Sequence, residues 1–368
     1  MSKLAAPLEQ PGNASAAVVW PQPGRKARFD LWLGGVCAAH ALVPHSLRLA
    51  SADASFRRYL RIDSAAGTRI IMDAPPDKED CRPFVRVAAL MAQAGLHVPQ
   101  VLAWDQEHGF LLLEDLGCQT MMQAIDRAHA QANLALYQAA VEVLVCWQKA
   151  SQPGVLPPYD EALLQRELGL FDQWYVRQHR AQVLDEQQHQ ALQDCYALIV
   201  RANLAGPSVY VHRDYMPRNL MLVEPPRDGI LPRLGVLDFQ DAVYGPITYD
   251  IASLTRDAFL SWDEEFVLDV TVRYWERARA AGLPVGADFG DFYRAVEWMG
   301  LQRHLKVAGV FARLTLRDGK PQYLADTPRF IAYIRSTAAR YRELRPLLRL
   351  VDSIEGLQAR SGYAFGRL

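Results

Sequence analysis

Apolar residues recur at two different spacings along this chain, and the spacing changes near residue 115. Up to that point, most apolar residues fall in short runs between turns, which is typical of strands, and two segments have helical spacing. Beyond it, apolar residues recur every three or four positions over long stretches, which predicts amphipathic helices. The pattern predicts strands over about 46–50, 56–62, 69–73, 101–104 and 110–113, and helices over 29–41, 82–94, 134–147, 163–174, 266–279, 292–311 and 330–344.

A polar motif and a hairpin interrupt the helical region. Residues 211–219 read Val-His-Arg-Asp-Tyr-Met-Pro-Arg-Asn, and Leu-Asp-Phe-Gln-Asp follows at 237–241. The spacing His-Arg-Asp-x-x-x-x-Asn, followed by an apolar strand that ends in Asp-Phe, is the layout of a site for phosphoryl transfer. In this layout Asp214 orients the acceptor hydroxyl and takes its proton, while Asn219 and Asp238 are oxygen ligands for Mg²⁺. Because antiparallel strands of similar length return to their start, the hairpin should place Asn219 beside Asp238.

The order of predicted elements indicates an α+β chain with a bilobal, protein-kinase-like fold. We expect a loosely ordered N-terminal segment (1–27), rich in Pro, Ala and Gln, and then a small β-rich N-lobe that binds nucleotide (28–115). The remaining part (116–368) should form a larger, mostly helical C-lobe that carries the catalytic loop, the metal site and the substrate site.

The N-lobe lacks two parts that such sites usually have. It contains no Gly-x-Gly-x-x-Gly loop, and the third strand has Met72 and Asp73 where a lysine would pair with the nucleotide phosphates. A cation is still required opposite those phosphates. Arg57 and Arg58 are the nearest candidates and Lys78 is a third, although each arginine could also be a surface charge of a strand.

Two further segments are expected to contact the nucleotide. Ser55 and Phe56 end the small polar turn that stands in place of the glycine-rich loop. Glu114 and Leu116 fall where the two lobes are expected to join, and the backbone groups there can pair with the edge of adenine.

Charge and cysteine usage narrow the class of protein. The 368 residues carry a formal net charge of −1, so no overall field favours nucleic acid or an anionic membrane. Five scattered cysteines, never spaced as Cys-x-x-Cys, argue against a disulfide framework and for a reducing compartment. No apolar run approaches the roughly 20 residues of a membrane span. We therefore expect a cytoplasmic protein with no nucleic-acid or membrane partner, and no obligate protein partner is evident.

Residues 245–254, which follow the hairpin, make the resemblance to a known family specific. With the two motifs above, the segment Gly-Pro-Ile-Thr-Tyr-Asp-Ile-Ala-Ser-Leu resembles the aminoglycoside phosphotransferase-like kinases. That resemblance implies the kinase fold and the cofactors ATP and Mg²⁺. It also implies that Asp250 braces the catalytic loop as structural support rather than taking part in the chemistry.

Further stretches resemble one subgroup, the anomeric N-acetylmuramate/N-acetylglucosamine kinases of bacterial cell-wall recycling. This resemblance covers about residues 28–345 and implies phosphorylation of the anomeric hydroxyl with ATP to the sugar α-1-phosphate. The Met-Asp-Ala-Pro-Pro run without the lysine is in keeping with that subgroup. The stretches are 54–59, 72–76, 166–175, 301–306, 311–313 and 317–320.

A cluster of positive charge supports a substrate that carries an anionic group. One C-lobe helix and the turn after it hold Arg303, His304, Lys306, Arg313 and Arg317. N-acetylmuramate carries a lactyl carboxylate, which an arginine can hold through two hydrogen bonds, whereas aminoglycosides are polycations. A solvated helix face would explain the same charges.

The candidate sugar-binding residues come from three places in the sequence. They are Arg303 and His304 on the basic helix, Arg218 in the catalytic loop, and Asp172 beside Trp174. Adjacent residues on a helix point about 100° apart, so Arg303 and His304 cannot both face one group.

Two other readings remain open. The chain could be another small-molecule kinase of the same fold, acting on an aminoglycoside, choline or a homoserine-like substrate. It could also be a pseudokinase that only binds its ligand. The intact Asp214, Asn219 and Asp238 oppose the second reading.

Overall fold

The computed structural model describes residues 18–20, 22–52, 56–227 and 229–357. The chain forms two compact units, each built from separate stretches of sequence. Unit 1 comprises residues 1–150 and 212–242, and unit 2 comprises residues 151–211 and 243–368. The segment with both polar motifs, from His212 to Ala242, belongs to unit 1.

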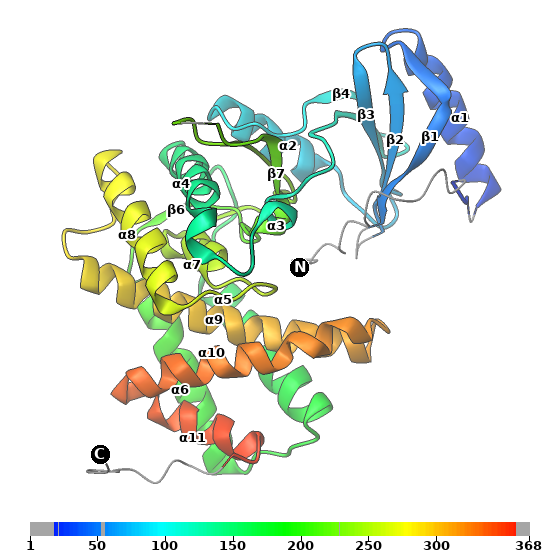
Figure 1. The fold of residues 1–368 in the computed structure, drawn as a ribbon. Helices are drawn as coiled ribbons and strands as arrows, with labels where there is room; N and C mark the ends of the chain where they lie inside the picture. Colours follow the sequence, from blue (N-terminus) through cyan, green and yellow to red (C-terminus); the bar gives the residue numbers. More distant parts are fainter. Residues whose placement is uncertain (1–17, 21, 53–55, 228, 358–368) are drawn as a thin grey trace. The chain divides into compact units, whose positions relative to one another are not determined.

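A five-stranded antiparallel sheet forms the core of unit 1. Its strands lie in the order β1-β2-β3-β5-β4. The helix between β3 and β4 therefore separates a three-stranded meander, β1 to β3, from the hairpin of β4 and β5 (Figure 1). The β2–β3 pairing runs without a break from Arg58, opposite Asp73, to Ser64, opposite Gly67. The strands are β1 (Leu42–Ala52), β2 (Arg58–Ser64), β3 (Gly67–Asp73), β4 (Val101–Asp105) and β5 (Phe110–Glu114).

The helix α1 (Pro23–Cys37) packs its apolar side on this sheet. Phe29 and Leu33 are buried among residues of four strands, and the ring of Phe29 meets the ring of Phe110 edge-on at 5.5 Å. Burial of large aromatic and aliphatic side chains is the main stabilising contribution in such a layer.

Unit 1 continues with three helices and a short hairpin. The helix α2 buries one apolar face, and its Phe84 stacks on Phe239, which follows the hairpin, at 4.9 Å. These elements are α2 (Arg82–Gln93), α3 (Met121–Ala124), α4 (Leu134–Lys149), β7 (Leu220–Glu224) and β8 (Arg233–Val236), with 3₁₀ turns η1 (Ala130–Asn133) and η3 (Pro217–Asn219).

Unit 2 is almost entirely helical, with one two-stranded ladder between β6 and β9. Its elements are α5 (Glu161–Leu170), η2 (Phe171–His179), α6 (Glu186–Leu204), β6 (Ser208–Val211), β9 (Val243–Pro246), α7 (Thr248–Thr255), α8 (Glu264–Ala280), α9 (Phe289–Leu316), η4 (Pro321–Asp326), α10 (Thr327–Arg340), η5 (Arg342–Leu344) and α11 (Arg345–Ile354).

The long helix α9 is the centre of unit 2. It contacts α5, η2, α6, α7, α8 and α10 (Figure 1). Every residue from Val296 to Leu314 is buried. A Cβ on Gly309 would lie 2.3 Å from the backbone carbonyl of Leu170, so α9 approaches the α5–η2 junction more closely than any larger residue would allow.

The predicted elements are found, but several have different ends. The first helix begins at Pro23, inside the N-terminal segment (1–27) that was expected to be loosely ordered, and residues 1–17 and 21 of that segment lie outside the described residues. The helix predicted over 330–344 ends at Arg340, and a separate 3₁₀ turn follows it. The helix predicted over 163–174 is α5 followed by the π-helix η2, a change of hydrogen-bond spacing that apolar periodicity does not report. The strand predicted up to Phe239 ends at Val236, because Asp238 has a left-handed backbone with φ +62°.

Candidate active site

A buried histidine connects the two polar motifs of unit 1. The imidazole Nδ1 of His212 accepts the backbone N–H of Asp214 at 3.2 Å, and its Nε2 lies 2.9 Å from the carbonyl oxygen of Leu237. Since Nδ1 is an acceptor, the proton is on Nε2, which donates to Leu237. His212 is fully buried, so this one ring fixes both the backbone N–H of Asp214 and the backbone carbonyl that precedes Asp238.

Asn219 and Asp238 lie side by side, as the hairpin predicts. The Asn219 Nδ2 donates to the carbonyl oxygen of Asp214 at 2.8 Å and to the Asp238 carboxylate at 3.3 Å. Both amide hydrogens are thereby used, which leaves the Oδ1 of Asn219 as the atom that a metal ion could contact. One amide oxygen and one carboxylate fit Mg²⁺, which takes its other ligands from water and phosphate.

Two residues of the site have strained backbones. Arg213 (φ +78°) and Asp238 (φ +62°) are in the left-handed region that residues other than glycine rarely adopt. Gln240 donates to the other Asp238 oxygen at 2.8 Å. Strain at two positions on either side of Asp214 is typical of a functional loop whose geometry is maintained by its surroundings.

Arg57 is buried beside the Asp238 segment and pairs with Glu79 at 3.4 Å. Burial alone would lower the pKa of Arg57, but the negative charges of Glu79, Asp238 and Asp241 and the neighbouring Tyr59 outweigh it, so the pKa is raised. The guanidinium therefore stays charged in the same electrostatic environment as the candidate metal ligands.

Arg58 has a different environment from that of Arg57. Its guanidinium and that of Arg25 in α1 each lie 2.5 Å from one oxygen of Asp73, which is almost fully buried at the end of β3. Asp73 therefore stands where a lysine was expected and holds two arginines instead. Arg58 also lies over the ring of Trp20 at 4.4 Å, so it has a cation–π contact besides its ion pair.

The segment after β5 is held by side chains of the sheet. Arg61 pairs with Asp115 at 2.6 Å and donates to the carbonyl oxygen of Gly117. The carboxylate of Glu114 accepts a hydrogen bond from His97 at 3.0 Å. Leu116 is buried against Gly235, where a Cβ would lie 2.7 Å from the Cδ1 of Leu116. These contacts fix the backbone of the segment for which adenine pairing was predicted.

The candidate turn at the start of β2 is described only in part. Ser55 lies outside the described residues, and Phe56 is exposed, with its N–H donating to Glu79 at 3.2 Å. Lys78, the third candidate cation, lies 5.9 Å from the Phe56 ring and pairs with Asp77. Of the three candidate cations, Arg57 is the one near Asp238.

A buried polar network surrounds the basic helix in unit 2. Lys306 pairs with Glu167 of α5 and donates to the hydroxyl of Tyr249, both at 3.0 Å. Glu167 also accepts from Tyr159 and from Gln302. Arg303 lies over the ring of Tyr249 at 4.6 Å. The face of α9 that was considered as solvated is thus buried, and its polar groups join three helices.

His304 is enclosed between helices. It stacks on Tyr333 at 4.5 Å, and its Nε2 donates to the carbonyl oxygen of Arg256 at 3.2 Å. Burial, and then the charges of Arg256 and Arg303, lower the pKa of His304 to about 3. It is therefore neutral at physiological pH.

The other residues predicted to bind sugar or brace the loop occupy separate positions. Asp172 pairs with Arg177 at 2.9 Å within η2, and Arg218 lies in the η3 turn. Asp250 is fully buried in the first turn of α7. Sugar binding by Arg218, Arg303, His304 and Asp172, and bracing by Asp250, stay predictions.

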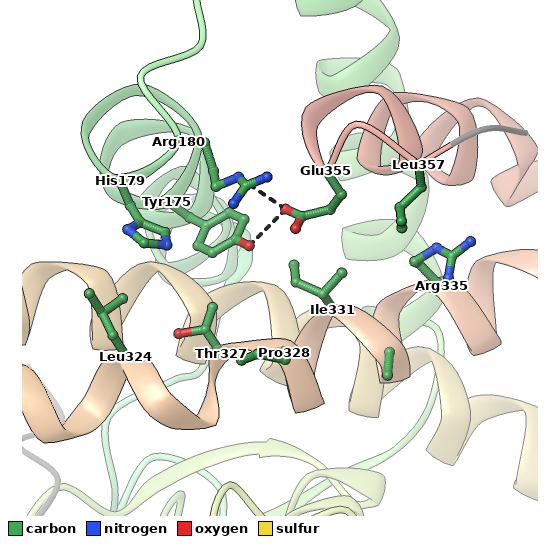
Figure 2. Close-up of a pocket in the computed structure, with 11 residues that line it drawn as sticks. Tyr175, His179, Arg180, Leu324, Thr327, Pro328, Ile331, Arg335, Glu355 and Leu357 are labelled. Atoms are coloured by element: carbon green, nitrogen blue, oxygen red, sulfur yellow. Dashed lines mark hydrogen bonds and ion pairs between the residues drawn. The ribbon is translucent and has the colours of Figure 1, made fainter.

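A cavity of about 340 Å³ opens in unit 2 between η2, α10 and the end of α11, and Figure 2 shows its lining. The hydroxyl of Tyr175 donates to Glu355 at 2.8 Å, and Arg180 pairs with the same carboxylate at 3.5 Å. None of the residues predicted to bind nucleotide, metal or sugar lines this cavity.

Several residues that contact the candidate site residues were missed in the sequence. Glu79 pairs with Arg57, and Gln240 donates a hydrogen bond to Asp238. Glu167 forms the ion pair with Lys306. Only Gln240 has a local signal, since it lies inside the second motif. Glu79 and Glu167 pair with residues remote in sequence, which no spacing indicates.

Within the described part of the chain, no cluster of three or more His, Cys, Asp or Glu side chains could hold a metal ion. The candidate metal ligands are Asn219 and Asp238. Among the described helices, none has the length and hydropathy to cross a membrane.

Curated relatives match nearly the whole chain. An N-acetylmuramate/N-acetylglucosamine kinase from Pseudomonas aeruginosa is 50% identical over 317 residues, which is 86% of this chain and 91% of the relative. A protein of the same name from Neisseria meningitidis serogroup B is 48% identical over 322 residues, 87% of this chain and 94% of that one.

Solved structures and a family model agree on the fold. An aminoglycoside 2′-phosphotransferase in its GDP complex superposes with a TM-score of 0.58 at 14% identity, covering 83% of this chain and 97% of that one. A choline/ethanolamine kinase family protein from Mesorhizobium loti superposes with a TM-score of 0.56 at 14% identity, covering 88% of this chain and 99% of that one. The fold is therefore α+β and protein-kinase-like, as predicted. Residues 46–284 match the model of the phosphotransferase enzyme family, and the chain belongs to that family.

Proposed function

We propose that this protein transfers the γ-phosphoryl group of ATP to the anomeric hydroxyl of N-acetylmuramate and N-acetylglucosamine, forming the sugar α-1-phosphates in peptidoglycan recycling. The observation that carries the proposal is the 50% identity, over 86% of this chain, to a relative with that name. The adjacency of Asn219 and Asp238, in the loop system of Asp214, supports active chemistry rather than binding alone.

The roles of the residues follow from their geometry. Asp214 accepts the proton of the anomeric hydroxyl as its oxygen bonds to the γ-phosphorus and the bond from that phosphorus to the β-phosphate oxygen breaks, releasing ADP. His212 and Asn219 hold the backbone on both sides of Asp214. A bound Mg²⁺, held by Asn219 and Asp238, would neutralise charge on the phosphates.

Arg57 is the residue that we assign to the phosphates in place of the expected lysine. It is buried, it stays charged, and Glu79 orients it, an arrangement with the same charges as the lysine–glutamate pair of protein kinases. Arg58 instead neutralises Asp73, which we regard as structural. Phe56 and the backbone of residues 114–116 complete the proposed nucleotide site. An amicoumacin kinase of similar fold (TM-score 0.55, 17% identity) was solved with AMP-PNP and Ca²⁺, which supports ATP as the donor.

The proposed compartment is the cytoplasm, with no nucleic-acid, membrane or obligate protein partner. All five cysteines lie in the described residues and are unbridged, which supports a reducing compartment.

A panel assay tests the proposal. The protein is incubated with ATP, Mg²⁺ and either N-acetylmuramate, N-acetylglucosamine, kanamycin or choline, and ADP release is followed. We expect turnover with the two amino sugars and ³¹P signals of the α-1-phosphates, both lost in Asp214→Asn. Turnover only with kanamycin or choline would replace this function by another kinase activity, and no turnover with any acceptor would support the binding-only reading.

A further inference from the structure

Both oxygens of the Asp238 carboxylate accept hydrogen bonds from side-chain amides. The Nδ2 of Asn219 donates to Oδ2 at 3.3 Å, and the Nε2 of Gln240 donates to Oδ1 at 2.8 Å. Because an ionised carboxylate can only accept hydrogen bonds, the nitrogen of the Gln240 amide, and not its oxygen, must face Asp238. Gln240, to which the proposed function gives no role, makes the shorter of the two contacts.

The backbone around Gln240 is fixed on both sides. Phe239 is fully buried, and its ring stacks on Phe84 of α2 at 4.9 Å. On the other side, the N–H of Ala242 donates to the carbonyl oxygen of Phe239 at 3.0 Å and closes a turn that contains Gln240. A side chain that starts from such a fixed position reaches Asp238, two residues earlier, in few conformations. The contact therefore restricts the rotation of the carboxylate.

The Gln240 amide orients Asp238 without adding a charge. Elsewhere in unit 1, the carboxylate of Asp73 is held by two arginines, which neutralise it. An arginine in the place of Gln240 would oppose the binding of a metal ion, because two positive charges repel each other. The charge of Arg57 also acts on Asp238, and Glu79 pairs with Arg57. The amide of Gln240 restricts the carboxylate and leaves its negative charge unchanged.

A restricted carboxylate matters for the metal ion expected at this site. Mg²⁺ requires nearly octahedral geometry with short bonds to oxygen, so a ligand that can turn away binds it less tightly. Side chains that hydrogen-bond to metal ligands orient those ligands, and their loss typically weakens metal binding by about 10- to 100-fold. Gln240 has the position and the chemistry of such a side chain toward Asp238.

We infer that Gln240 is a positioning residue for the metal ion: its amide holds the Asp238 carboxylate in the orientation that binds Mg²⁺ together with Asn219. This inference rests on the proposed function, which assigns Asn219 and Asp238 to the metal. Gln240 acts through Asp238 and contacts neither the ion nor the phosphates. It thereby lowers the Mg²⁺ concentration that the protein requires to bind its nucleotide together with the metal.

Binding of ADP tests the inference without turnover. The melting temperature is measured at saturating ADP while Mg²⁺ is titrated, and the affinity for ADP is measured by calorimetry in EDTA. Gln240→Met keeps the length of the side chain and removes the amide. In this variant we expect the Mg²⁺ concentration at the half-maximal shift to rise about 10- to 100-fold, with the affinity for ADP in EDTA unchanged.

The matched control is Gln131→Met. Gln131 is an exposed glutamine of η1 and belongs to the same unit as Gln240. This variant should require the same Mg²⁺ concentration as the wild type.

A double-mutant cycle shows whether Gln240 acts through Asp238. In the Asp238→Ala background, Gln240→Met should cause little further increase in the Mg²⁺ requirement, because the carboxylate that it positions is absent. A further increase as large as that in the wild-type background would mean that Gln240 binds the ion itself, and would overturn the inference.

Three other results would overturn the inference. An unchanged Mg²⁺ requirement in Gln240→Met would mean that the contact supports only the turn. A loss of ADP affinity in EDTA would mean that the amide contacts the phosphates directly. A wild type whose ADP binding does not respond to Mg²⁺ would leave no metal ion for Gln240 to position. If the wild type bound ADP with Mg²⁺ but phosphorylated neither sugar, the proposed acceptor would fail, while the variants would still decide the role of Gln240.

Discussion

His212 donates a hydrogen bond from Nε2 to the carbonyl oxygen of Leu237 at 2.9 Å, while its Nδ1 accepts the N–H of Asp214. The His212 ring therefore fixes the distance between the backbone of Leu237, which precedes Asp238, and the backbone of Asp214. Asn219 adds a second connection through its amide nitrogen. The relative position of the two carboxylates depends on these neutral side chains.

Replacement of His212 should destabilise the fold. His212→Phe keeps a ring of similar size but leaves a buried N–H and a buried carbonyl without partners, at roughly 1–3 kcal/mol each. We expect the free energy of unfolding, measured with urea, to fall by about 2–6 kcal/mol. His129→Phe is the control, because that side chain is 76% exposed. A change below about 0.5 kcal/mol in His212→Phe would contradict this role of the His212 ring.

Asp214→Asn should abolish most of the activity and leave the fold intact. The change keeps the size of the side chain but removes its charge and its ability to accept a proton, a contribution of typically about 10²- to 10⁴-fold. The measurement is kcat with N-acetylglucosamine, together with ATP binding by calorimetry. More than about a tenth of wild-type activity would show that another group takes the proton.

Asn219→Ala and Asp238→Ala should each raise the Mg²⁺ concentration required for half-maximal rate. Each change removes one hard oxygen from a cation that accepts few other ligands. A Mg²⁺ titration at saturating ATP measures the effect, and Asp63→Ala, a half-exposed carboxylate on β2, is the control. An unchanged Mg²⁺ requirement in both variants would place the metal elsewhere.

His304 should make the protein less stable as the pH falls below 6.5. Its pKa is about 3 in the folded protein and near 6.5 when unfolded, so in this window the unfolded chain binds more protons. Between pH 7 and pH 5 this residue should remove about 2 kcal/mol from the free energy of unfolding. His304→Gln, which does not titrate, should lack that loss, whereas the exposed His129→Gln should retain it. Equal pH dependence in His304→Gln and the wild type would mean that the ring is protonated in the folded state.

Two glycine-to-alanine changes in helices should have opposite effects. A Cβ at Gly309 would clash with the backbone of Leu170 and Phe171, so Gly309→Ala should destabilise by about 1–3 kcal/mol. A Cβ at Gly34 in α1 meets nothing within 4 Å, so Gly34→Ala should stabilise by about 0.5–1 kcal/mol. Equal shifts of the urea midpoint in the two variants would contradict the close approach of α9 to the α5–η2 junction.

Much of the fold and the centre of the site could be predicted from the sequence, because they depend on local order. The spacing of apolar residues indicates the strands and helices. The short hairpin brings Asn219 and Asp238 together by its local geometry, whatever the rest of the fold. The family resemblance also depends on motifs that are contiguous in sequence, and the comparisons confirm it.

Pairings between remote side chains were decided only by the tertiary structure. Glu79 as the partner of Arg57, and Asp73 as the partner of Arg58, depend on how the turn before α2 and the end of β3 pack. Gln302 and Glu167 are 135 positions apart and meet because α9 crosses α5. The sequence shows which of these residues are charged or polar. It does not show which two of them form a pair, because pairing depends on distances across the folded core. For the same reason, the sequence by itself placed Lys306 among five positive residues, and only the packing of α9 against α5 gave it Glu167 as its partner.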